Sequence, residues 1–191
     1  YLITLKLVTT ISQFSQAPFY SKIPVFSGLR IKNELSVLAN KSRSSMNKSL
    51  YVFVLGISFL FLFGDYFLYF IGSNINLESP SFIILMAFIW FFERHHAMHA
   101  QIYVTTNKIP FYKTATISGL FNILLMTILV PIYGVWGFPM SLGFSNLLIN
   151  NWWNVKISLE SINFNFIPYF KKSALFPLIL LTLLVYFKLI F

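Results

Sequence analysis

The chain has 191 residues, of which 57% are hydrophobic and only 10% are charged. These values exclude a soluble domain, which carries about 25% charged residues, and the apolar content excludes a disordered chain. The charge is unbalanced, with 14 basic against 5 acidic residues and a net charge of +9. In a membrane protein such a surplus marks loops on the cytoplasmic side. The chain has no cysteine, so it has no disulfide framework and no thiolate metal site.

Six apolar segments are long enough to cross a bilayer, which takes about 20 mostly apolar residues. They are too long and too uniformly apolar for the strands of a membrane barrel, which alternate over about 10 residues. We therefore predict an all-α integral membrane protein. The six expected spans are Leu2 to Ser27, Leu50 to Gly72, Pro80 to Thr105, Phe111 to Pro131, Val135 to Val155, and Ser173 to the end. The chain begins with Tyr1 and ends inside a hydrophobic run, so we expect a fragment of a longer membrane protein.

Basic residues mark every second connection between these spans. The connections around 73–79 and 131–137 contain no Lys or Arg. Ten of the 14 basic residues lie in the other three: Arg30, Lys32, Lys41, Arg43, Lys48, Lys108, Lys113, Lys156, Lys171 and Lys172. The positive-inside rule then places these three connections in the cytoplasm and the first residue outside. The expected partner is a lipid bilayer and not a nucleic acid, because the basic residues are divided among short loops and form no single face.

The third expected span contains an unusual cluster of ionisable residues, all within seven positions: Glu93, Arg94, His95, His96 and His99. Helical spacing puts His95 and His99 on one face and Glu93 and His96 on another, with Arg94 offset from both. Three interpretations stay open. The cluster lines a polar cavity and contacts an anionic substrate or carries protons; it binds zinc, although a third ligand is lacking; or Arg94 reaches the interface and the histidines pack structurally.

Polar residues in two other spans have two interpretations each. Gln13 and Gln16 lie about one turn apart beside Pro18, where they either face a cavity or form hydrogen bonds between helices. Asp65 is the only acidic residue of the second span, and it either pairs with a base on another helix or lies near the headgroups. The sequence has no Ser-His-Asp pattern, no phosphate-binding glycine loop and no paired carboxylates, so neither a catalytic site nor a cofactor is expected.

The order and spacing of several motifs resemble a known family over nearly the whole chain. The first span leads into a basic amphipathic stretch, and a Gly-x-x-Asn helix precedes a Tyr-Gly-x-x-Gly hairpin. These motifs are Gln13…Gln16-Ala17-Pro18-Phe19-Tyr20, Thr105 to Phe111, Ser118-Gly119-Leu120-Phe121-Asn122, Pro131 to Gly137, and Asn151-Trp152-Trp153. The chain resembles the C-terminal half of the lipid-linked oligosaccharide (O-antigen type) flippases, which are polysaccharide biosynthesis proteins of the MATE-like multidrug/oligosaccharidyl-lipid/polysaccharide superfamily.

The resemblance implies a fold of two six-helix lobes around a central cavity, of which this chain forms most of one lobe. Residues 1–157 would be five spans of the C-terminal lobe, with a cytoplasmic amphipathic segment at 28–48. Residues 158–172 would be a cytoplasmic connection, and residues 173–191 would start an additional transmembrane helix. The function implied is export of undecaprenyl-diphosphate-linked oligosaccharide across the bacterial inner membrane by alternating access, beside the polysaccharide polymerase and chain-length machinery.

The expected site residues come from their chemistry and not from a matched family motif. Substrate-binding residues would be Arg94, His95, His96, His99, Gln13 and Gln16. Residues for ion or proton coupling would be Glu93 and Asp65. Arg94 is the expected contact of the diphosphate, because a cationic cavity suits that group. Two other functions stay open, namely a transporter of the same superfamily for another cargo and an integral-membrane acyltransferase or polymerase that uses the histidines.

Overall fold

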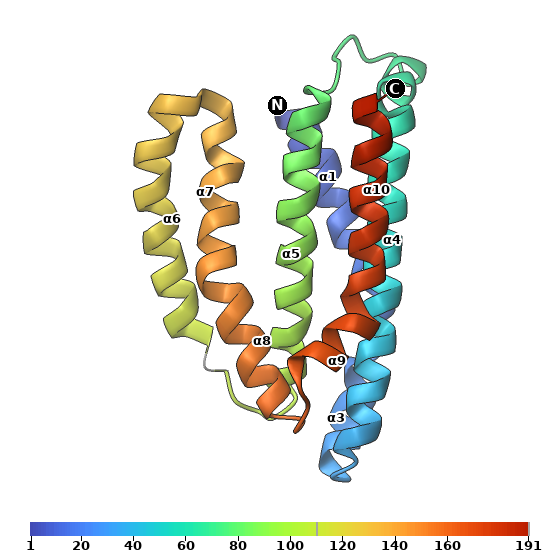
Figure 1. Ribbon diagram of the computed structural model, residues 1–191, viewed down its shortest axis with the longest axis vertical. Coiled ribbons are helices and arrows are strands. Elements are labelled where there is room, and N and C mark those ends of the chain that lie inside the picture. The colour runs from blue at the N-terminus through green and yellow to red at the C-terminus, as the bar shows by residue number, and fades with distance from the viewer. Residues whose placement is uncertain (110, 191) are drawn as a thin grey trace.

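The computed structural model describes residues 1–109 and 111–190, and every regular element within these ranges is helical. Grouped by their connections, the elements form six long segments that run in alternating directions (Figure 1). In chain order the elements are α1 Leu2–Ser15, α2 Ala17–Tyr20, α3 Ile23–Ile31, α4 Leu35–Phe70, α5 Pro80–Val104, α6 Phe111–Tyr133, the 3-10 turn η1 Gly134–Trp136, α7 Gly137–Ser145, the π-helical turn η2 Asn146–Asn150, α8 Asn151–Glu160, α9 Phe166–Phe170, the π-helical turn η3 Lys171–Leu175, and α10 Phe176–Ile190.

Three helical stretches of the described residues are long and apolar enough to cross a membrane: Leu35–Phe70, Phe111–Glu160 and Phe166–Tyr186. The second stretch is a hairpin, because it contains α6 and its return through α7, η2 and α8. The predicted all-α class is therefore confirmed, and three helical stretches have the length and apolar composition that a membrane span needs. The prediction of six spans and the assignment to one lobe of a transporter stay predictions.

The basic stretch 28–48 differs from the expected surface helix. Its first residues end α3, and the chain turns at Asn33, whose φ of +58° is a left-handed conformation that Asn tolerates. From Leu35 onward α4 continues without a break for 36 residues, because no Pro or Gly interrupts it before Gly56. At about 1.5 Å per residue α4 is roughly 54 Å long. The helix is therefore longer than the hydrocarbon layer of a bilayer, which is about 30 Å thick, by several turns.

The connection expected at 158–172 is shorter in the structure. Helix α8 continues to Glu160, only residues 161–165 connect it to the next helix, and α9 begins at Phe166. Pro168 lies in the first turn of α9, where a missing N–H costs no helical hydrogen bond. The last segment thus begins before residue 173, the start expected for it, and residue 191 of the expected span lies outside the described residues.

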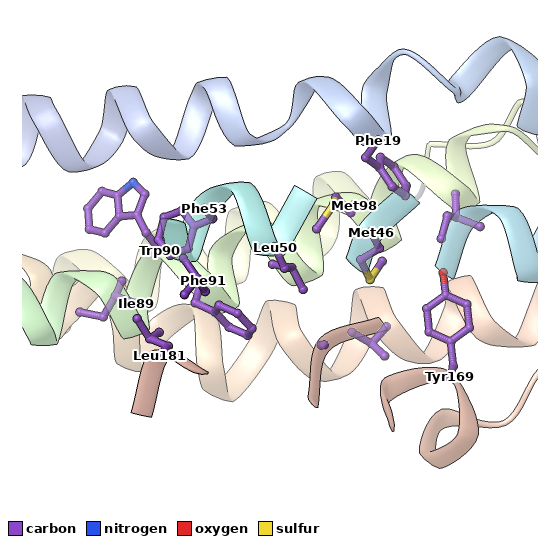
Figure 2. Packing of buried hydrophobic residues seen from close by; sticks show 14 of the residues in the cluster. Phe19, Met46, Leu50, Phe53, Ile89, Trp90, Phe91, Met98, Tyr169 and Leu181 are labelled. Carbon is purple, nitrogen blue, oxygen red and sulfur yellow. The ribbon is translucent and has the colours of Figure 1, made fainter. Parts of the chain in front are cut away.

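The buried core lies between α4, α5 and the segments on either side of them. Figure 2 shows Met46, Phe53, Phe91 and Tyr169 directed into this space, with Phe19 of α2 above it. Phe53 and Phe91 pack with their ring centroids 6.3 Å apart, which joins α4 to α5. By contrast, α6 buries only two residues within the described structure and contacts mainly α7 at one edge of the bundle (Figure 1). This apolar hairpin therefore offers most of its surface to lipid or to another part of the protein.

We predict that Gly137→Ala destabilises the α6–α7 hairpin, because a Cβ at Gly137 would lie 2.6 Å from the backbone nitrogen of Val130. Overpacking against backbone costs about 1–3 kcal/mol. The temperature at which the purified protein loses its monodisperse elution in detergent measures the effect. Gly119→Ala is the control, since nothing lies within 4 Å of its added Cβ. Equal melting temperatures for the two variants would contradict the packing at this turn.

Candidate functional site

Helix α5 carries the charged cluster, and its geometry directs neighbouring side chains toward different helices. Ser79 caps the start of α5 by accepting a hydrogen bond from a first-turn amide, and Pro80 occupies a first-turn position where no N–H is needed. Each later residue is rotated by about 100° from the one before it. Glu93, Arg94 and His95 are adjacent in the sequence but therefore lie on three different faces of α5.

The Glu93 carboxylate faces η2 and accepts three hydrogen bonds. Its Oε1 accepts from Arg94 Nη2 at 3.1 Å, and its Oε2 accepts from His96 Nε2 at 2.9 Å and from Asn146 Nδ2 at 2.7 Å. Asn154 Nδ2 lies 3.4 Å from His96 Nδ1. One neutral tautomer satisfies both contacts, because His96 Nε2 then donates to the carboxylate and Nδ1 accepts from the amide. The carboxylate is thus bound by donors from two segments of the bundle.

Polar residues recur at every fourth position of the facing segment, namely Asn146, Asn150, Asn154 and Ser158, and three of them, Asn146, Asn154 and Ser158, bond side chains of α5. The first two lie in the π-helical turn η2, a backbone form frequent at functional sites. Asn150 Nδ2 donates to Asn146 Oδ1 at 2.8 Å and to Ser118 Oγ of α6 at 3.0 Å. The sequence analysis missed these residues, although their four-residue spacing on one helical face was a readable signal. We call the contacts of Glu93, His96 and His99 with this row the polar seam.

His95 and His99 face away from Arg94, into the core. His99 Nδ1 lies 3.1 Å from Ser158 Oγ, and its ring packs 5.1 Å from the ring of Tyr169. His95 packs against His99 at 4.8 Å and against Phe170 at 5.6 Å. Both histidines are buried. The structure therefore separates the expected substrate-binding residues, because His95 and His99 do not share a face with Arg94.

The guanidinium of Arg94 has unused donors. Its side chain is 16% exposed, and within the described residues only Glu93 accepts a hydrogen bond from it. Its Nε is buried without a partner. Trp90 and Gln101 lie on the same face of α5 by helical spacing, and the side chain of Gln101 lies near the hydroxyl of Tyr20 on α2. This face of α5 therefore looks toward the segment formed by α1 and α2.

A cavity of about 740 Å³ lies between α1, α5, α6 and α7. Its walls are mainly apolar, with Trp90 from α5 and Phe138 from α7. Polar groups come from Lys6 and Thr9 of α1 and from Asn122 of α6, whose buried Oδ1 has no hydrogen-bond partner. An apolar space with a few polar groups on its walls is the usual form of a ligand site.

The expected residues Gln13, Gln16 and Arg94 do not line this cavity but continue its walls. Gln13 and Gln16 follow Thr9 by one and two turns on the same face of α1, and Arg94 follows Trp90 by one turn on α5. Gln13 is exposed and Gln16 is half-buried. We call the cavity the α1–α6 cleft, and Gln13, Gln16 and Arg94 lie one or two helical turns beyond its lining residues.

Asp65 lies away from the cluster of Glu93, Arg94 and the histidines. It lies exposed near the end of α4, and its Oδ1 accepts a hydrogen bond from the backbone amide of Leu77 at 2.8 Å. This contact fastens the connection between α4 and α5 to the end of α4. The structure thus gives Asp65 a partner in a loop and no contact with Glu93 or Arg94.

Arg30 forms hydrogen bonds to other helices, which its position in the basic stretch 28–48 did not predict. Its Nε donates to Thr105 Oγ1 at 2.6 Å, its Nη1 donates to the carbonyl of Ser161 at 2.8 Å, and its Nη2 reaches the carbonyl of Ile102 at 3.3 Å. One guanidinium therefore joins the ends of α3, α5 and α8. Arg30 closes the bundle at the end where most basic residues lie.

Within residues 1–109 and 111–190 no group of three or more His, Cys, Asp or Glu side chains is arranged to hold a metal ion. His95 and His99 are neighbours, but the other groups around them are aromatic rings and a serine. Comparison of the chain with protein-family models, with curated proteins and with solved structures finds no match. The roles of the site residues therefore rest on geometry and chemistry.

We predict that Asn146→Ala lowers the free energy of unfolding by about 1–3 kcal/mol, because the substitution removes a donor to a largely buried carboxylate. Unfolding in detergent, followed by thermal melting or by denaturant, measures the loss. Asn40→Ala is the matched control: Asn40 bonds only Arg43 on the exposed surface of α4, and such contacts contribute little. A loss no larger than that of the control would show that the polar seam does not stabilise the fold.

Proposed function

We propose that this chain is the C-terminal half of a flippase that moves undecaprenyl-diphosphate-linked oligosaccharide across the bacterial inner membrane by alternating access. The observation that carries the proposal is the α1–α6 cleft, a cavity of about 740 Å³ with polar side chains on its walls inside an apolar helical bundle. A membrane-embedded cleft of this kind suits a polar cargo that has to pass an apolar layer. The second lobe of the transporter would form the facing wall.

The distribution of charge supports six spans with a defined orientation. The connections 105–109 and 161–165 and the start of α4 lie at one end of the bundle, the lower end in Figure 1. Lys41, Arg43 and Lys108 lie at this end, whereas the connections 71–79 and 134–136 at the other end contain no Lys or Arg. By the positive-inside rule the basic end faces the cytoplasm.

Arg94 is the group that we assign to the diphosphate. A guanidinium is always charged and presents paired donors that match phosphate oxygens. One of these donors already bonds the Glu93 carboxylate. On entering the cleft, the diphosphate would replace this carboxylate as the partner of Arg94. Lys6, on the cleft wall toward the outer end, would offer a second cation along the path.

Glu93 is the residue that we assign to coupling. When the diphosphate takes Arg94, the carboxylate loses one counter-charge but keeps His96 and Asn146 as donors. A charge without a counter-charge in an apolar bundle is costly, which favours uptake of a proton or cation at Glu93. Substrate binding and ion binding would then be linked through one shared hydrogen bond.

The orientation is tested by single cysteines, since the chain has none of its own. We expect Asn74→Cys and Val135→Cys to react with a membrane-impermeant thiol reagent added to intact cells. Ile109→Cys should react only after permeabilisation. All three residues are exposed in connections or turns of the bundle. Reaction of Ile109→Cys in intact cells, or protection of Val135→Cys, would overturn the six-span topology.

We predict that Arg94→Ala reduces glycan export at least tenfold in a complementation assay at equal protein abundance. The loss would follow from removal of the charge-assisted hydrogen bonds to the diphosphate. Arg43→Ala makes the same change on α4, where the half-buried guanidinium bonds Asn40 and lies over the Phe164 ring, and it should leave export unchanged. Normal export by Arg94→Ala would remove Arg94 from the substrate site.

A further inference from the structure

A second crevice, of about 750 Å³, lies on the side of α5 away from Arg94. Phe92 and His95 of α5 form its floor, Leu147 of η2 lies on one wall, and Phe170 of α9 lies on the other. The lining is mostly apolar, and the crevice belongs to no part of the α1–α6 cleft. Its lining therefore suits an apolar ligand that is separate from the ligand of the α1–α6 cleft.

The mouth of the crevice lies toward the basic end of the bundle. Trp152 and Trp153 line it and are largely exposed, with 70% and 54% of their surface accessible. Tryptophan favours the level of the headgroups in a bilayer. The crevice thus opens sideways into the leaflet that faces the basic connections.

The rim carries one positive and one negative charge. Lys156 Nζ and Glu160 Oε1 lie 4.0 Å apart, and their side chains are 75% and 63% exposed. Such an exposed pair is weak and is easily exchanged for other partners. A phospholipid with a phosphate and an ammonium group offers one opposite charge to each residue. A phosphatidylglycerol would satisfy Lys156 alone.

The floor carries a polar group without a partner. His95 is buried, and its Nε2 has no hydrogen-bond partner. His96 on α5 pairs with Asn154 on α8, and His99 pairs with Ser158. His95 therefore lies at the level of α8 just before the helical turn that carries Lys156 and Glu160. His95 therefore contributes its ring to the floor, with Nε2 closed off from the crevice.

We propose that this crevice binds one phosphatidylethanolamine molecule from the cytoplasmic leaflet. Its acyl chains fill the apolar space between α5, α8 and α9. The phosphate bonds Lys156, and the ammonium group bonds Glu160. The lipid is a structural ligand of the bundle, and its binding does not depend on the identity of the transported cargo.

The first test compares two neighbouring substitutions in the purified full-length protein. Leu147 lines the crevice and is 37% exposed, whereas Leu148 is 60% exposed and does not line it. The protein is incubated with equal amounts of phosphatidylethanolamine and phosphatidylglycerol in detergent, and retained lipid is counted by native mass spectrometry. We expect Leu147→Trp to retain at least fivefold less phosphatidylethanolamine, and Leu148→Trp to retain the wild-type amount. Equal retention by both variants would overturn the site.

The second test uses surface charges, whose replacement leaves folding unaffected. One charge near a bilayer surface changes lipid binding about fivefold. The wild type should therefore prefer phosphatidylethanolamine over phosphatidylglycerol by about fivefold. Glu160→Gln should abolish this preference, Lys156→Gln should weaken the retention of both lipids, and Lys172→Gln, away from the crevice, should change neither. A wild type without preference, or one that retains polyprenyl phosphate in place of phospholipid, would overturn the proposal.

Discussion

The Glu93 carboxylate is the constraint on which the arrangement of the bundle depends. A charge within apolar helices is costly unless hydrogen bonds and a counter-charge compensate it. Glu93 obtains both, from Arg94 and His96 on its own helix and from Asn146 across the interface. These bonds fix the rotation of α5 against η2 and α8. The remaining faces of α5 are then determined, because a helix turns as one rigid unit.

With α5 fixed in this way, one helix separates two compartments of different chemistry. Its Trp90 and Arg94 face borders the α1–α6 cleft, where polar groups lie on the walls. Its Phe92 and His95 face forms the floor of an apolar crevice. The polar seam lies between them and joins α5 to α8, while Arg30 fastens the same helices at their ends. The proposed cargo site and the proposed lipid site would then lie on two faces of one helix.

The sequence predicted the features that depend on composition and local spacing. Apolar runs and alternating basic loops indicated an all-α membrane protein, and helical spacing correctly put His95 and His99 on one face and Glu93 and His96 on another. The partner of Glu93 lies 53 residues away at Asn146, and nothing local indicates which helix faces which. The continuity of α4 through the basic stretch was also missed, because polarity suggested a boundary where the backbone has no helix-breaking residue.

The central claim is that a cleft accessible to water runs along one face of α1, and thiol modification in native membranes tests it most directly. Gln13 lies on that face, whereas its neighbour Phe14 is rotated by about 100° and is 73% exposed on the surface of the bundle. In full-length protein, the rate of reaction with a membrane-impermeant thiol reagent is measured for Gln13→Cys and Phe14→Cys. The account predicts that Gln13→Cys reacts at least tenfold faster. Equally slow reaction at both positions would contradict it, since the face of α1 would then lie in lipid or in a dry helix contact.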